Sequence, residues 1–135
     1  EILGSNPLVV VDGAHNPPGA EAAARTLKRS FPLEGNLILI VGMTEEKNAE
    51  WMLECLEADH AQFIICTEAA TPRAMSARDL AATAEKFSSN VVVRSNPEAA
   101  LELAISQSEP NDVVMGTGSL YVVGALRDAY FSKHV

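Results

Sequence analysis

The residues whose types and spacing could do chemistry begin with Asp-Gly-Ala-His-Asn-Pro at positions 12–17. Asp12 follows the apolar run Leu8–Val11, and a carboxylate there can accept hydrogen bonds from the hydroxyl groups of a ribose. His15 stands just before a predicted helix, whose N-terminal N–H groups and dipole favour anions. A histidine there can donate to a phosphate or carboxylate, or transfer a proton. The alternative is that Asp12 and Asn16 only cap the turn and the helix, with His15 on the surface.

Two later segments also contain groups that can bind anions. The loop Gly42–Asn48 contains Lys47, a cation that can hold a carboxylate. The alternative is a solvated lysine that forms weak ion pairs with neighbouring glutamates. The segment Gly116–Ser119 contains two glycines whose backbone N–H groups can form an anion-binding nest, and Ser119 can cap a helix or bind a ligand. It is not a dinucleotide fingerprint, because Tyr121 stands where the third glycine belongs.

Short apolar runs alternate with amphipathic segments along the whole chain, and these elements must position the loops. Continuous apolar runs are typical of strands that are buried on both faces of a sheet. The predicted strands are Leu8–Val11, Leu37–Val41, Phe63–Cys66, Val91–Val93 and Val113–Met115. The predicted helices lie near Asn16–Phe31, Asn48–Ala58, Ser76–Phe87, Asn96–Ile105 and from Ser119 to Phe131. The pattern predicts an α/β domain with a mostly parallel sheet and helices on both faces.

A parallel sheet binds its ligands outside the carboxyl ends of the strands, where the strand order switches. The loops that follow the predicted strands therefore share one edge. We expect Asp12, His15, Lys47 and Ser119 to converge there.

Length and net charge indicate how many domains the chain forms and which partners it is not expected to bind. The 135 residues are the size of one domain. Ten Lys and Arg against eighteen Asp and Glu give a net charge of −8. We therefore expect neither nucleic acid nor membrane as a partner, because both bind dense basic surfaces. No apolar run approaches the roughly 18 residues that span a bilayer. The two cysteines make no disulfide framework, so a cytoplasmic location is expected.

Two motifs are missing from the sequence. No Gly-x-x-x-x-Gly-Lys-Ser/Thr segment occurs, so the chain has no P-loop for the phosphates of a nucleotide. Its histidines and cysteines lack the spacing of a zinc site, and we expect no metal-binding residues here.

Four segments in order resemble the C-terminal domain of folylpolyglutamate synthase/dihydrofolate synthase, a member of the Mur ligase superfamily. They cover essentially the whole chain, at residues 12–17, 42–47, 71–77 and 116–124. The second departs from the family pattern, because Glu46 and Asn48 flank Lys47 where the family usually has aspartates. The resemblance implies a Rossmann-like three-layer domain of about five or six strands. One of these strands would be antiparallel, and it would lie near residues 1–4 or be cut away from this chain.

The resemblance also implies a reaction. ATP would phosphorylate a carboxylate of dihydropteroate or folate, and the amine of L-glutamate would attack the acyl phosphate to form an amide. Residues 1–135 would be the glutamate ligase domain. The enzyme's own N-terminal and central domains, which carry the P-loop and most ligands of Mg²⁺, would be absent from this chain. The isolated chain is then expected to be inactive.

Residue by residue, the resemblance assigns Asp12 to the ribose of ATP. It assigns His15, as the catalytic residue, to the reacting phosphate and the incoming glutamate. Lys47 and Ser119 match positions that, in the wider superfamily, hold the carboxylates of the incoming amino acid.

Two alternative functions stay open. One is the C-terminal domain of a peptidoglycan-precursor ligase, although those enzymes usually carry a lysine or arginine near the position of His15. The other is a non-catalytic, doubly wound binding module. A receiver-like module would need an aspartate at the end of the third strand, where Cys66 and Thr67 stand.

Overall fold

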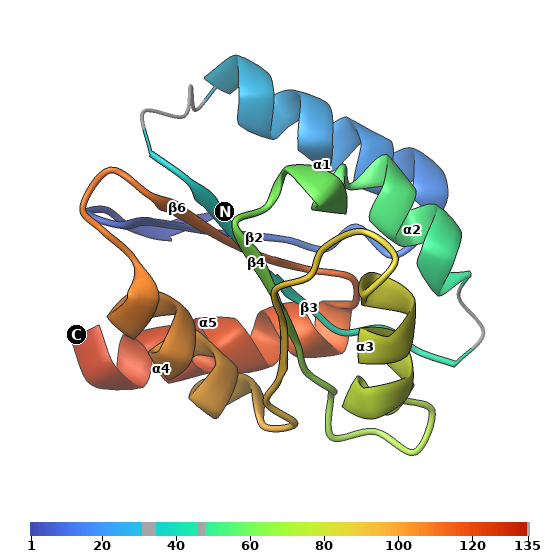
Figure 1. Cartoon of the computed structure of the whole chain (residues 1–135). Helices are drawn as coiled ribbons and strands as arrows, with labels where there is room; N and C mark the ends of the chain where they lie inside the picture. The colour runs from blue at the N-terminus through green and yellow to red at the C-terminus, as the bar shows by residue number, and fades with distance from the viewer. Residues whose placement is uncertain (31–34, 46–47, 135) are drawn as a thin grey trace.

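The computed structural model describes residues 1–30, 35–45 and 48–134, and the predicted helix end at Phe31 lies outside them. A six-stranded sheet with the order β1-β2-β6-β3-β4-β5 runs through the centre (Figure 1). Its strands are β1 (Ile2–Gly4), β2 (Leu8–Asp12), β3 (Leu37–Val41), β4 (Phe63–Cys66), β5 (Val91–Val93) and β6 (Val113–Thr117). Only β1 pairs in the antiparallel sense, with β2. The expected parallel sheet with one antiparallel strand near residues 1–4 is confirmed.

Helices cover both faces of this sheet and make three layers. They are α1 (Pro17–Ser30), α2 (Ala49–Cys55), α3 (Ala77–Ala84), α4 (Pro97–Gln107) and α5 (Leu120–His134), with a 3₁₀ turn η1 at Ala58–His60. One core joins α1, α2 and α3 to one face, and a second core joins α4 and α5 to the other. This confirms the three-layer α/β class. None of the helices within the described ranges is long and apolar enough to cross a bilayer.

The alternation of side chains along β3 explains its unbroken apolar run. Leu39 and Val41 belong to the core under α1–α3, while Ile38 and Ile40 belong to the core under α4 and α5. All four are at most 1% exposed. Because both faces of the strand are covered, a polar residue at any of these positions would be desolvated without a partner.

Several element boundaries differ from the sequence prediction, among them the ends of β6, α2 and α3. β6 continues through Gly116 to Thr117, because both residues pair with β2 and β3. Helix α2 ends at Cys55, and Glu57 just beyond it has a left-handed backbone with φ of 57°. Helix α3 ends at Ala84 instead of Phe87. Such boundaries depend on strand pairing and on the turn that follows the element. A local pattern of apolar residues does not predict either of them.

The ends of the three neighbouring strands lie in register. Asp12 of β2 pairs with Thr117 of β6, and Thr117 pairs on its other side with Val41 of β3. Gly118 follows with φ of +110°, and a Cβ built on it would lie 2.3 Å from the carbonyl oxygen of Gly42. Only glycine can therefore make the turn from β6 towards α5 at this position.

We predict that Gly118→Ala destabilises the fold by more than about 1–2 kcal/mol. That is the usual cost of a left-handed backbone for an L-residue, and the contact with the carbonyl oxygen of Gly42 adds to it. Urea denaturation of the variant measures the free energy of unfolding.

Gly124→Ala is the matched control, because a Cβ at Gly124 meets nothing within 4 Å and the residue lies inside α5. It should stabilise the protein by about 0.5–1 kcal/mol through helix propensity. Equal effects of the two substitutions would contradict the assignment of Gly118 as a constrained turn.

Candidate functional site at the carboxyl edge of the sheet

Asp12 and His15 lie together at the carboxyl edge of β2, as predicted. The half-buried Asp12 carboxylate accepts a hydrogen bond from the Ala14 N–H at 2.9 Å through Oδ1. The exposed His15 ring has Nδ1 3.1 Å from the carbonyl oxygen of Gly13. A carbonyl only accepts, so this contact requires the hydrogen on Nδ1 and leaves Nε2 as the second ring nitrogen of an exposed side chain. Nε2 can accept a proton in the neutral ring or donate one in the charged ring.

The expectation that the first turn of α1 offers free backbone N–H groups to an anion is wrong. Pro17 and Pro18 have no N–H to offer, and the Gly19 N–H donates to Oδ1 of Asn16 at 2.8 Å. The Ala20 N–H donates to the carbonyl oxygen of Asn16 at 2.9 Å. The first turn therefore offers an anion its dipole but no backbone donor, and His15 is the donor group beside it.

Ser119 lies at the start of α5 and caps that helix. Its Oγ accepts hydrogen bonds from the N–H groups of Tyr121 at 3.0 Å and Val122 at 3.4 Å. Both acceptor sites of the hydroxyl are thus occupied, while its own hydrogen is left to donate. The capping role that the sequence allowed is present, and a donor to a carboxylate is still available from the same group.

Lys47 lies outside the described residues, whereas Thr44 and Glu45 of the same loop form backbone contacts with the loop after β4. The N–H of Glu45 donates to the carbonyl of Arg73 at 2.8 Å, and Thr44 forms a β-bridge with Ala74. The loops that follow β3 and β4 are thus joined as a short antiparallel ladder. This ladder brings the exposed Arg73 beside the loop that contains Lys47.

Two polar groups of the strand ends are fully buried. Cys66, at the end of β4, is 0% exposed, and burial raises the pKa of its thiol to about 12. It is therefore uncharged at neutral pH and is not a nucleophile. Thr117, at the end of β6, is also 0% exposed, and its Oγ1 has no hydrogen-bond partner among residues 1–30, 35–45 and 48–134. The predicted strand ends before Thr117, at Met115, and only the packing shows that the hydroxyl is isolated.

Large apolar side chains stand in solvent in the first turns of the helices that leave this edge. Leu120 and Tyr121 of α5 are 66% and 62% exposed, and Trp51 of α2 is 55% exposed. Trp51 therefore lies on the surface of α2 and is not part of the core. Exposed apolar groups around a polar site are typical of a surface that another domain or a ligand covers.

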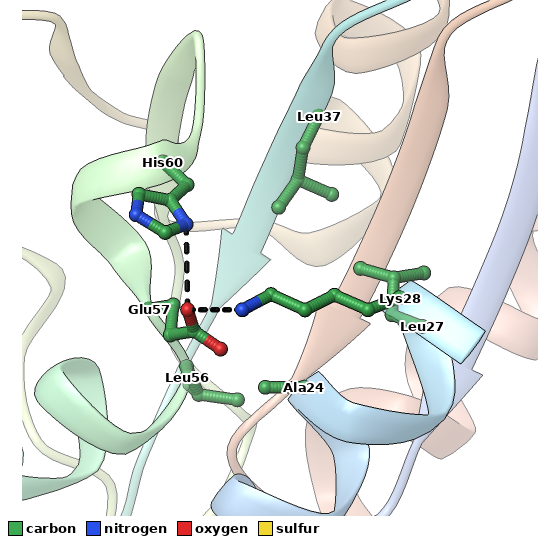
Figure 2. Close-up of a pocket in the computed structure, with 7 residues that line it drawn as sticks. All are labelled: Ala24, Leu27, Lys28, Leu37, Leu56, Glu57 and His60. Carbon is green, nitrogen blue, oxygen red and sulfur yellow. Dashed lines mark hydrogen bonds and ion pairs between the residues drawn. The ribbon is translucent and has the colours of Figure 1, made fainter. Parts of the chain in front are cut away.

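A cavity of about 220 Å³ lies at the opposite, amino-terminal end of the strands (Figure 2). Its floor is apolar, and on its rim Lys28 donates to Glu57 at 2.5 Å, with His60 3.4 Å from the same oxygen. The rim groups already bind one another at the surface. Because the cavity lies at the other end of the strands, it is not part of the edge that carries Asp12 and Ser119.

Fold and site together define a glutamate ligase domain of the Mur ligase type. The family model of the Mur ligase glutamate ligase domain matches residues 1–120. The chain belongs to this family.

Two relatives illustrate the range of the family. The dihydrofolate synthase/folylpolyglutamate synthase of Bacillus subtilis is 31% identical over 94% of this chain and 29% of that protein. A UDP-N-acetylmuramoyl-L-alanyl-D-glutamate–2,6-diaminopimelate ligase of Chromobacterium violaceum is 30% identical over 83% of this chain and 23% of that protein. The chain spans less than a third of the length of these relatives.

Solved structures have the same fold. Mycobacterium tuberculosis folylpolyglutamate synthase complexed with ADP matches with a TM-score of 0.87 and 28% identity, over 96% of this chain and 31% of that one. A bifunctional folylpolyglutamate synthase/dihydrofolate synthase with Mn, AMPPNP and L-glutamate bound matches with a TM-score of 0.82 and 25% identity. That match covers 100% of this chain and 31% of the other.

We predict that Ser119→Ala destabilises the chain by about 1 kcal/mol, because the first turn of α5 loses its cap. Thermal or urea unfolding measures the loss. Ser119→Thr keeps the hydroxyl and is expected to recover most of the stability. An unchanged free energy of unfolding in Ser119→Ala would show that Oγ does not stabilise α5.

Proposed function

We propose that this chain is the C-terminal domain of an ATP-dependent ligase that adds L-glutamate to dihydropteroate or folate through an acyl phosphate. The longer protein would also contain the N-terminal and central domains that bind most of ATP. The observation that carries the proposal is the convergence of the loops after β2, β3 and β6 at one edge, where Asp12 and Thr117 end in register. Membership of the glutamate ligase domain family supports it.

The chemistry has two steps. A carboxylate oxygen of the pterin-linked substrate attacks the γ-phosphorus of ATP, and ADP leaves. The amine of L-glutamate then attacks the acyl carbon, the tetrahedral intermediate expels inorganic phosphate, and the nitrogen loses a proton. Mg²⁺, held mainly by the other domains, would neutralise phosphate charge. Within the described residues, no group of three or more Asp, Glu, His or Cys side chains gathers to hold a metal.

The first role of this domain would be to hold the nucleotide from its ribose side. Asp12 uses Oδ1 for the Ala14 N–H, so its remaining lone pairs are available to the ribose hydroxyl groups. His15 is exposed on the same turn and uses Nδ1 for the Gly13 carbonyl, so Nε2 is its second functional nitrogen. From there it could donate to the reacting phosphate, or take the proton that the amine of glutamate releases.

The second role would be to hold the incoming glutamate. A positioned amine attacks far faster than a free one, and its two carboxylates are the groups by which it can be clamped. Ser119 would contribute the hydrogen of its hydroxyl, since Oγ already accepts from α5. Lys47 would contribute a positive charge. A domain that brings these donors only on closure also keeps water from the acyl phosphate.

The assay that tests this proposal uses the longer protein that contains these residues. We expect release of ADP and phosphate only when ATP, L-glutamate and dihydropteroate or a folate are all present, with formation of a glutamyl amide. The isolated chain of 135 residues is expected to form no product, because it has no P-loop.

The same assay separates the other candidate functions. Product formed on a UDP-linked muramyl acceptor with a different amino acid would favour the peptidoglycan branch, which the Chromobacterium violaceum relative represents. No release of ADP with any acceptor would favour a non-catalytic module. Ligase activity in the isolated chain would contradict the proposal that another domain must supply the P-loop.

In the longer enzyme, Asp12→Asn is predicted to raise the KM for ATP by about 10-fold or more, the cost of one hydrogen bond to a charged group. The amide oxygen still accepts from the Ala14 N–H, so the fold should be kept. His15→Ala is predicted to lower kcat by roughly 10²–10⁴-fold, the usual contribution of a proton-transfer group.

Asp59→Asn and His60→Ala are the matched controls, because both residues are exposed on η1 at the amino-terminal end of the strands. They should leave the kinetics unchanged. A fall in melting temperature that accounts for the lost activity of Asp12→Asn or His15→Ala would favour the capping interpretation.

A further inference from the structure

The hydroxyl of Thr117 is an exception among the buried polar groups of this edge. It is 0% exposed, and its Oγ1 has no partner in the part of the chain that the structure describes, whereas buried hydroxyl groups in native proteins are almost always hydrogen-bonded. Thr67, just past the end of β4 and two strands away, follows the common rule, because its Oγ1 donates to the carbonyl of Ser95 at 3.1 Å. A valine of nearly the same shape at position 117 would avoid this unpaired group, so the threonine lowers stability where it stands.

Sheet geometry brings Thr117 and Asp12 to the same face. Met115 belongs to the core under α1–α3, and Thr117, two residues further along β6, points to the same side. Leu8 packs against that core too, and Asp12, four residues further along β2, shares its side. Since Asp12 and Thr117 are register partners on neighbouring strands, their Cα atoms lie about 5 Å apart.

The Thr117 hydroxyl can donate a hydrogen bond, and the Asp12 carboxylate can accept one. Among the described residues, the Thr117 hydroxyl lacks an acceptor, and the Asp12 carboxylate accepts a hydrogen bond from the Ala14 N–H through Oδ1. The hydroxyl has one hydrogen to donate and needs only a rotation of its side chain to seek an acceptor. The carboxylate at the neighbouring register position can accept it.

We propose that Thr117 is a positioning residue for nucleotide binding: its hydroxyl donates to the Asp12 carboxylate when a ribose binds and holds that carboxylate towards the sugar hydroxyl groups. The proposal rests on the proposed function, since it assumes that Asp12 contacts ATP. The hydrogen bond forms in the nucleotide complex, so the unpaired hydroxyl of the free domain is the unsatisfied half of a binding interaction.

The test compares Thr117→Val, which removes the hydroxyl and keeps the shape, with Thr117→Ser, which keeps the hydroxyl. In the longer enzyme, Thr117→Val is expected to raise the KM and the dissociation constant for ATP by up to about tenfold, as the loss of one hydrogen bond to a carboxylate does. The KM for glutamate, kcat and the melting temperature should not fall. Thr117→Ser is expected to restore ATP affinity.

Thr67→Val is the matched control at the same edge. Because its hydroxyl already donates to Ser95, we expect this variant to lose melting temperature and to keep its affinity for ATP. The opposite pattern in the two valine variants is what a positioning role predicts and a packing role does not.

A double-mutant cycle with Asp12→Asn tests whether the effect passes through the carboxylate. In the Asp12→Asn background, Thr117→Val should weaken ATP binding no further. An equal weakening in both backgrounds, or unchanged ATP affinity in Thr117→Val alone, would overturn the proposal.

Calorimetric titration with ATP separates this proposal from the proposed function. A wild-type enzyme that binds ATP and makes no glutamyl amide contradicts the function, and the Thr117 variants still decide the role of the hydroxyl by binding alone. A wild-type enzyme that binds no ATP overturns both.

Discussion

The approach of Gly118 to the carbonyl oxygen of Gly42 is the constraint on which the candidate site depends. It exists because β6, the last strand in the sequence, lies between β2 and β3, and its end must leave the sheet between two other loops. A side chain at Gly118 would occupy the position of that oxygen. The turn it permits sets the direction of α5 and places the Ser119 cap at the edge that carries Asp12.

The sequence predicted the strands well where their burial is complete. Leu37–Val41 and Phe63–Cys66 match the structure residue for residue, because a strand covered on both faces needs an unbroken apolar run. The end of β6 was predicted too early, since Gly116 and Thr117 look like the residues of a turn. Their extended backbone comes from ladders to β2 and β3, and those partners are more than 70 residues away in the sequence.

The candidate site was predictable to the extent that it is local. Asp12 and His15 belong to one turn, and their place at a strand end follows from the apolar run before them. The isolation of the Thr117 hydroxyl could not be predicted, because it is a property of packing between strands. Pro17 and Pro18 can be read from the sequence. The sequence does not show that the Gly19 N–H donates to Asn16, which removes the next backbone donor from an anion site.

The electrostatics of the chain explain why its donors must be few and local. A net charge of −8 repels ATP and glutamate at long range, so the domain does not attract its proposed ligands through its overall field. The first turn of α1 adds no backbone donor, because Pro17 and Pro18 have no N–H. Binding at this edge would therefore depend on single groups, such as Nε2 of His15 and the hydrogen of the Ser119 hydroxyl. Such groups are effective only when water is excluded, because hydrogen bonds and charges act more strongly in a medium of low dielectric constant. The exposed side chains of Trp51, Leu120 and Tyr121 around this edge are suited to exclude water once a second domain covers them.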